Sequence, residues 1–256
     1  MSIIEALAAC KDAPAFAASS LQYLVLMGSH AFRTANETSD RDFYGWCVPP
    51  AAERRRFQDF TALGATVEGT GELVDFKIYN VNRFFARCAE GGSQALETLF
   101  ADESCVVHTS PAAQLLRQQR KMFLHAGTAR EFRRFAFAQF DDMVHQRRRD
   151  GKRLESIERY GFDRKAAYHS VRLMNEAHQL LTEGDLDLTR SREQLVAIRS
   201  GEWTLSEIIA YFERMDATLD GLYGTTCLPA SPDKKAIESL RRTCLRNAQA
   251  VQVTGE

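Results

Sequence analysis

The segment from residue 21 to residue 48 constrains the fold of this chain more than any other. An apolar run typical of a strand ends at Gly28-Ser29, and a second apolar run begins directly after Asp40 and Asp42. This order predicts a strand, a glycine turn, a polar loop and a second strand. Residues i and i+2 of a strand point to the same face, so the two aspartates are expected to lie together.

The residue types in this segment favour phosphate and metal chemistry. Gly28 and Ser29 offer backbone N–H groups and one hydroxyl without side-chain bulk, which suits a phosphate. Asp40 and Asp42 could share one divalent cation or hold a pair of them. Together these features indicate phosphoryl or nucleotidyl transfer. The alternatives are structural, because glycine, serine and aspartate are also common in simple turns.

A third carboxylate is expected on the next strand. Residues 73–79 alternate apolar and polar side chains, which is the period of a strand with one buried face. Asp75 lies on the polar face and is the predicted third member of the site. Glu72 is a rival that ranks second because it lies at the start of the strand. A solvated surface position is the alternative for Asp75.

The motifs at Gly28-Ser29 and Asp40-Arg41-Asp42 resemble the signature of the DNA polymerase beta-type nucleotidyltransferase superfamily. The resemblance is strongest to the branch of nucleotidyltransferases associated with RNA ligases, and it runs from about residue 21 to about residue 215. An ordered series of matches is more specific than the first motif alone. The further matching segments are residues 75–79, 83–84, 96–100, 160–165, 169–173 and 198–203.

The resemblance implies transfer of a nucleoside monophosphate from an NTP to a hydroxyl acceptor such as an RNA end, with release of pyrophosphate. It implies Mg²⁺ or Mn²⁺ as cofactor, bound by Asp40, Asp42 and Asp75, the three catalytic carboxylates. In the family the third carboxylate also orients or deprotonates the acceptor hydroxyl, a role that falls to Asp75. Gly28 and Ser29 would bind the triphosphate.

Arg33 departs from the family pattern, which usually has glycine at this position. A residue with a Cβ adopts positive φ at a cost, so either the loop follows another path or Arg33 adds a phosphate contact. This departure keeps a second function open, that of a catalytically silent nucleotide-binding module that serves as a sensor or partner subunit.

A helix expected over residues 155–182 carries a second group of polar residues. Lys165, His169, Arg172 and Glu176 lie on one stripe of this helix. By position alone the stripe is best explained as a solvated face. The resemblance implies nucleotide binding by the first three, with phosphate contacts from Lys165 and Arg172. His169 is either a substrate contact or a satisfied interior histidine.

Residues 130–153 hold eight Lys or Arg against four Asp or Glu. Such a segment could serve as an electrostatic track for RNA or DNA. Solvated helix ends that interact with the helix dipole are the explanation we favour. RNA binding through this segment is a third hypothesis for the protein, and it would show a steep dependence on salt.

The expected fold class is α+β. Residues 1–108 would form the nucleotidyltransferase domain, a polymerase beta-like mixed sheet with flanking helices, and residues 109–256 an all-helical domain. Strands are expected at residues 21–27, 42–48 and 73–79, with a mobile loop at 51–71. Helices are expected at residues 2–19, 81–90 and 93–100, from Pro111 onward, and at 129–149, 155–182, 191–199, 204–222 and 232–247.

The composition is that of a globular protein without a membrane segment. The net charge of −1 gives no overall attraction to nucleic acid or membrane, so any polyanion contact must be local. No apolar run approaches the ~20 residues of a membrane helix. The six cysteines are scattered without zinc spacing, which predicts reduced thiols in a cytoplasmic protein. The expected partners are an NTP and an RNA or other hydroxyl acceptor, with no membrane partner and the oligomeric state left open.

Overall fold

A computed structural model of the chain describes residues 2–67, 72–147 and 150–254. The chain divides into two compact units. The sheet unit comprises residues 1–90, 94–123 and 233–256, and the helical unit comprises residues 91–93 and 124–232. The assignment of separate domains to residues 1–108 and 109–256 stays a prediction.

A mixed five-stranded sheet forms the centre of the sheet unit, which confirms the α+β fold class. The strand order is β3-β4-β2-β1-β5. β2 and β4 are parallel, and the other neighbours are antiparallel. The strands are β1 (Leu21–Leu26), β2 (Arg41–Cys47), β3 (Asp59–Val67), β4 (Glu72–Asn80) and β5 (Val106–Thr109).

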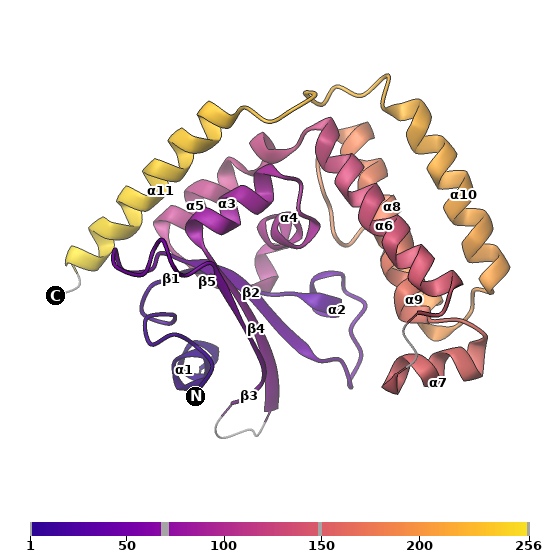
Figure 1. Cartoon of the computed structure of the whole chain (residues 1–256), viewed down its shortest axis with the longest axis horizontal. Helices are drawn as coiled ribbons and strands as arrows, with labels where there is room; N and C mark the ends of the chain where they lie inside the picture. The colour runs from indigo at the N-terminus through magenta and orange to yellow at the C-terminus, as the bar shows by residue number, and fades with distance from the viewer. Residues whose placement is uncertain (1, 68–71, 148–149, 255–256) are drawn as a thin grey trace. The chain divides into compact units, whose positions relative to one another are not determined.

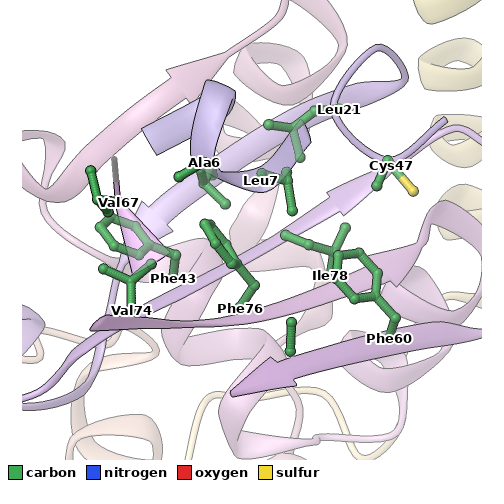
Figure 2. Close-up of a cluster of buried hydrophobic side chains, with 13 residues drawn as sticks. Ala6, Leu7, Leu21, Phe43, Cys47, Phe60, Val67, Val74, Phe76 and Ile78 are labelled. Carbon is green, nitrogen blue, oxygen red and sulfur yellow. The ribbon is translucent and has the colours of Figure 1, made fainter. Parts of the chain in front are cut away.

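Alternating side chains of β2 and β4 divide the sheet into two faces. On one face Phe43 and Phe76 pack against Leu7 of helix α1 (Ile3–Ala9), in the buried cluster shown in Figure 2. On the other face Trp46 of β2 stacks on Phe84 of helix α3 (Val81–Ala89), with ring centroids 6.2 Å apart. Both faces are therefore covered where the strands pass through the core.

The predicted strands at residues 21–27, 42–48 and 73–79 are confirmed as β1, β2 and β4. The predicted loop at residues 51–71 is wrong, because residues 59–67 form β3, which pairs with β4. Residues 68–71 lie outside the described residues. The predicted helix over residues 2–19 is also too long. α1 ends at Ala9, and Cys10 already has extended backbone angles.

The remaining helices of the sheet unit surround its sheet. Pro111 occupies the first turn of α5, as predicted, and Ser110 caps this helix. α11 packs along α3 and α5 (Figure 1). These helices are α2 (Gly28–Ala31), α4 (Ser93–Phe100), α5 (Pro111–Gln118) and α11 (Lys234–Thr254), with 3₁₀ turns at Glu103–Cys105 and Arg120–Phe123.

The helical unit is built around α8 (Arg164–Glu183), which packs against α6 (Ala126–Val144) and α10 (Leu205–Leu222). The single helix predicted over residues 155–182 is wrong. The chain breaks between α7 (Gly151–Tyr160) and α8, where Gly161 adopts φ +83° and the Asp163 side chain accepts hydrogen bonds from the first N–H groups of α8. The helix predicted at residues 191–199 is confirmed as α9 (Arg192–Ser200).

All six cysteines are free thiols. Within the described ranges no helix combines the length and the apolar character that crossing a bilayer requires.

Candidate active site

The turn after β1 brings Gly28 against the carboxylate of Asp42. Gly28 begins α2 with φ +59°, a conformation that glycine adopts without steric cost. The backbone N–H of Met27 donates to the carbonyl oxygen of Asp42 at 2.7 Å, which ties the end of β1 to the start of β2. A Cβ on Gly28 would lie 2.3 Å from Asp42 Oδ2. Only glycine therefore fits at this position without displacing the carboxylate.

Asp42 and Asp75 occupy paired positions on neighbouring strands. β2 and β4 run parallel, and these two residues are register partners. In-register residues of adjacent strands share one face of the sheet, and the strands lie about 4.8 Å apart. Both aspartates are half-buried. The two carboxylates are therefore on the same face of the sheet, as the predicted metal site requires.

The carboxylate of Asp75 accepts a hydrogen bond from β3, a strand that was not predicted from the sequence. The backbone N–H of Gly64 on β3 donates to Asp75 Oδ1 at 2.7 Å. The β3–β4 register shifts between Ala62 and Ala65, and Gly64 adopts φ +65°, which defines a β-bulge. A glycine inside an alternating segment is the sequence signal that could have indicated this bulge.

The polar loop between β1 and β2 closes on Ser29. The Ser29 carbonyl oxygen accepts hydrogen bonds from the Thr34 backbone N–H at 2.8 Å and from Thr34 Oγ1 at 3.4 Å. Ser29 itself is half-buried. Asp40 is exposed and precedes β2, which begins at Arg41. The predicted roles of Ser29 and Asp40 stay predictions.

Arg33 adopts the backbone conformation that a glycine would provide. Its φ is +52°, in the left-handed region, so the departure from the family pattern leaves a glycine-like backbone in place. Its guanidinium Nη2 lies 3.4 Å from both Asp102 Oδ1 and Ser104 Oγ. Hydrogen bonds from Ser104, with a smaller contribution from the charge of Arg33, lower the pKa of Asp102.

Tyr44 shares the face of the two carboxylates and was not among the predicted site residues. It lies two positions beyond Asp42 on β2, so strand alternation places it on the same face. Burial, followed by the negative charge of Asp42, raises the pKa of Tyr44 above its ordinary value of 10.0. The phenol is therefore neutral at physiological pH.

The stripe on α8 lies in the helical unit and is not a fully solvated face. Lys165 is exposed and His169 half-buried, whereas Arg172 and Glu176 are buried and form an ion pair at 3.4 Å. Burial, then the charges of Arg172 and Lys165, hold the pKa of His169 well below 6.5. Nucleotide binding by Lys165, His169 and Arg172 stays a prediction.

The donors at this site fit a hard cation. Across residues 2–67, 72–147 and 150–254, no group of three or more His, Cys, Asp or Glu side chains is arranged to hold a metal ion. The pair of Asp42 and Asp75 offers oxygen ligands only. Mg²⁺ binds through one or two protein carboxylates and keeps water and substrate phosphates as its other ligands. The pair therefore suits Mg²⁺ or Mn²⁺ that arrives with a triphosphate.

A mixed five-stranded sheet with in-register aspartates beside a glycine turn is the arrangement expected of a polymerase beta-type nucleotidyltransferase. The sequence matches the family model RlaP, the RNA repair pathway DNA polymerase beta family, over residues 2–219. The chain belongs to this family. This membership confirms the resemblance seen in the sequence and supports nucleotidyl transfer as the general activity.

The sequence was also compared with curated proteins and the fold with solved structures. No curated protein matches the sequence. Among solved structures, the chain is similar to a nucleotidyltransferase-like protein from Exiguobacterium sibiricum 255-15, determined at 1.90 Å resolution. The two share 11% sequence identity, the match covers 92% of this chain and 69% of that chain, and the TM-score is 0.32. A TM-score of this size supports no functional argument.

Proposed function

We propose that the protein transfers a nucleoside monophosphate from an NTP to a hydroxyl acceptor, with release of pyrophosphate and with dependence on Mg²⁺ or Mn²⁺. The observation that carries this proposal is the register pairing of Asp42 and Asp75 beside Gly28. The family's place in an RNA repair pathway supports an RNA end as the acceptor. The free cysteines support a cytoplasmic location.

In the proposed reaction the acceptor oxygen forms a bond to the α-phosphorus of the NTP. The bond between the α-phosphorus and the bridging oxygen breaks, and pyrophosphate leaves. Asp75 accepts the proton of the acceptor hydroxyl. The Gly64 N–H donates to its Oδ1 and so orients this carboxylate. A bound divalent cation would neutralise charge on the triphosphate.

The other site residues have proposed binding roles. Gly28 and Ser29 bind the triphosphate through backbone N–H groups and the Ser29 hydroxyl. Asp40 adds a carboxylate for the cation together with Asp42. Lys165, His169 and Arg172 contribute to nucleotide binding. Because the pKa of His169 is depressed, this residue would act as a neutral hydrogen-bonding group rather than as a cation.

A second candidate function is a catalytically silent nucleotide-binding module. The position of Asp40 favours this second function, because Asp40 is exposed and precedes β2. A site formed by Asp42 and Asp75 without Asp40 offers fewer carboxylate ligands for a pair of cations. Calorimetric titration separates the two functions. Mg²⁺-dependent NTP binding without any turnover would favour the silent module over the enzyme.

The test of the enzyme is incubation of the protein with an α-labelled NTP, Mg²⁺ or Mn²⁺, and RNA, protein or aminoglycoside-like acceptors. We expect label transfer to RNA and stoichiometric pyrophosphate release with the wild type, and neither with Asp42→Ala. Absence of both products in the wild type with every acceptor would contradict the proposal.

A further inference from the structure

Three consecutive arginines in the sheet unit have no role in the proposed active site. Arg54, Arg55 and Arg56 form a turn between β2 and β3. The Arg54 side chain is tied down, since its Nε donates to the carbonyl oxygen of Pro49 at 3.3 Å. Arg55 and Arg56 are exposed. In the described part of the chain neither has a carboxylate partner, which leaves two uncompensated positive charges at the surface.

The arginine turn is fixed in place by a buried asparagine. Asn80 Nδ2 donates to the carbonyl oxygens of Arg54 and Phe57, both at 2.7 Å. The Asn80 backbone N–H donates to the carbonyl oxygen of Gln58 at 2.8 Å. Asn80 is only 1% exposed, so all of these hydrogen bonds are shielded from water. These hydrogen bonds therefore fix the backbone conformation of the arginine turn.

The same asparagine joins the arginine turn to two further basic segments. Asn80 Oδ1 accepts the backbone N–H of Asn82 at 2.8 Å and so caps α3, whose first turn carries Arg83. Arg241 Nη1 of α11 donates to Asn82 Oδ1 at 2.5 Å. One hydrogen-bonded network thus links the arginine turn, the start of α3 and Arg241 of α11. We define the basic surface as Arg55, Arg56, Arg83, Arg241 and Arg242.

The basic surface carries an excess of positive charge. Its carboxylate neighbours along the chain are Glu53, Asp59 and Glu238, of which Asp59 already pairs with Lys77 at 3.5 Å. Glu238 pairs with both Arg241 and Arg242, at 2.7 Å and 2.8 Å. One carboxylate cannot neutralise two guanidinium groups, and within the described ranges Arg83 makes no ion pair. The net local charge is positive in a protein whose total charge is −1.

In the other arginine-rich segment, residues 130–153 of the helical unit, several of the described arginines pair with carboxylates, and residues 148–149 lie outside the described residues. Arg133 pairs with Asp216 and Asp220, both at 2.6 Å. Arg134 pairs with Glu131 and Arg147 with Asp141. In each of these pairs a carboxylate offsets the charge of the arginine that it contacts. The basic surface of the sheet unit is thus the stronger candidate for a polyanion.

We infer that the basic surface binds the phosphate backbone of the RNA acceptor, and this inference rests on the proposed function for the choice of RNA. Arg55 and Arg56 would contact phosphates directly, because both are exposed and unpaired. Such contacts carry no base specificity and position the strand. Binding by counterion release makes the affinity fall as the salt concentration rises.

The experiment measures fluorescence anisotropy of a labelled 20-nucleotide RNA over a series of salt concentrations, with wild-type protein and no NTP. We expect Arg55→Gln/Arg56→Gln to weaken binding. We also expect the slope of log affinity against log salt to fall by about 1.4, roughly 0.7 for each single-strand phosphate that an arginine no longer neutralises. Arg55→Lys/Arg56→Lys should keep most of the affinity, because it keeps the charge.

The matched control is Arg134→Gln/Arg147→Gln, which removes two exposed positive charges that are each paired with a carboxylate. We expect RNA binding by this control to equal that of the wild type. Equally weakened binding in both double variants, or unchanged binding in Arg55→Gln/Arg56→Gln, would overturn the inference. RNA binding is measured without NTP and therefore does not depend on nucleotidyl transfer. A protein that binds RNA as expected but transfers no nucleotide would contradict only the proposed function.

Discussion

Gly28 and Asp42 are in such close contact that the Cα of the glycine faces the carboxylate of the aspartate. An added Cβ would lie 2.3 Å from Asp42 Oδ2, well inside van der Waals contact. This contact couples the turn that would hold a triphosphate to the strand that would hold a cation. The proposed triphosphate site and the proposed cation site are thus formed by the turn after β1 and by the adjacent strand β2.

The first prediction concerns this contact. Gly28→Ala should abolish detectable nucleotidyl transfer, because the new methyl group displaces the Asp42 carboxylate. It should also lower the free energy of unfolding by about 1–2 kcal/mol, the cost of a left-handed backbone for alanine. Both quantities can be measured on one sample, by pyrophosphate release and by urea denaturation.

Gly161→Ala is the matched control for Gly28→Ala. Gly161 adopts φ +83°, and a Cβ there would meet no atom within 4 Å. This variant should suffer a similar loss of stability and keep its transfer activity. Wild-type activity in Gly28→Ala would show that the contact with Asp42 has no role in catalysis.

The second prediction is that catalysis requires Asp75 but not another carboxylate of the same sheet. Asp75→Asn should reduce kcat by at least about a hundredfold, because a neutral amide neither binds a cation well nor accepts the acceptor proton. The control is Asp59→Asn on β3, whose carboxylate pairs with Lys77 at 3.5 Å. A partly exposed pair of this kind contributes about 0–1 kcal/mol, so the control should stay active. Equal kcat values for the two variants would refute the role of Asp75.

The third prediction concerns the backbone strain at Arg33. Because Arg33 has φ +52°, Arg33→Gly should be more stable than Arg33→Ala by roughly 1 kcal/mol. At an ordinary helical position the order is reversed, since glycine there costs about 0.5–1 kcal/mol relative to alanine. Urea denaturation of the two variants shows directly which of them has the larger free energy of unfolding. A more stable alanine variant would mean that the loop does not use a left-handed residue here.

The fourth prediction is a pH dependence that arises from His169. Burial and neighbouring cations depress its pKa in the folded state, so between that value and about 6.5 the unfolded chain binds more protons than the folded one. The contribution of the neutral ring to stability should be complete above pH 6.5 and should decline as the pH falls below it. His169→Gln should show a weaker decline. An NMR titration in which the folded imidazole protonates at pH 6.5 or above would contradict this prediction.

Local sequence was sufficient to predict part of the fold and to place Asp42 and Asp75 on strands, whereas the roles of the site residues stay predictions. The apolar run after Ala18, the glycine turn and the alternation around Asp75 indicated β1, β2 and β4 correctly. The start of α5 was equally visible, because Pro111 marks the first turn of a helix. These features depend on neighbours in the sequence, so the sequence alone reveals them.

Features that depend on distant pairing were missed. In β3 the central residues Ala62, Gly64 and Ala65 have low strand propensity, yet pairing with β4 makes the segment a strand. The hydrogen bond from Gly64 to Asp75 was invisible for the same reason. The parallel register that joins Asp42 to Asp75 is likewise set by contacts far apart in the chain. The break at Gly161 was different, since its glycine and the Asp163 cap were present in the sequence and were outweighed by the long helical period.

The central claim is that Asp42 and Asp75 together hold a divalent cation against a nucleoside triphosphate. The most direct test is a crystal structure with Mn²⁺ and a non-hydrolysable NTP, in which anomalous scattering locates the metal. The prediction is a manganese peak bound by oxygens of both carboxylates and by the triphosphate, with phosphate oxygens at the N–H groups of Gly28 and Ser29. A triphosphate bound elsewhere, or a manganese peak that touches neither aspartate, would contradict the account.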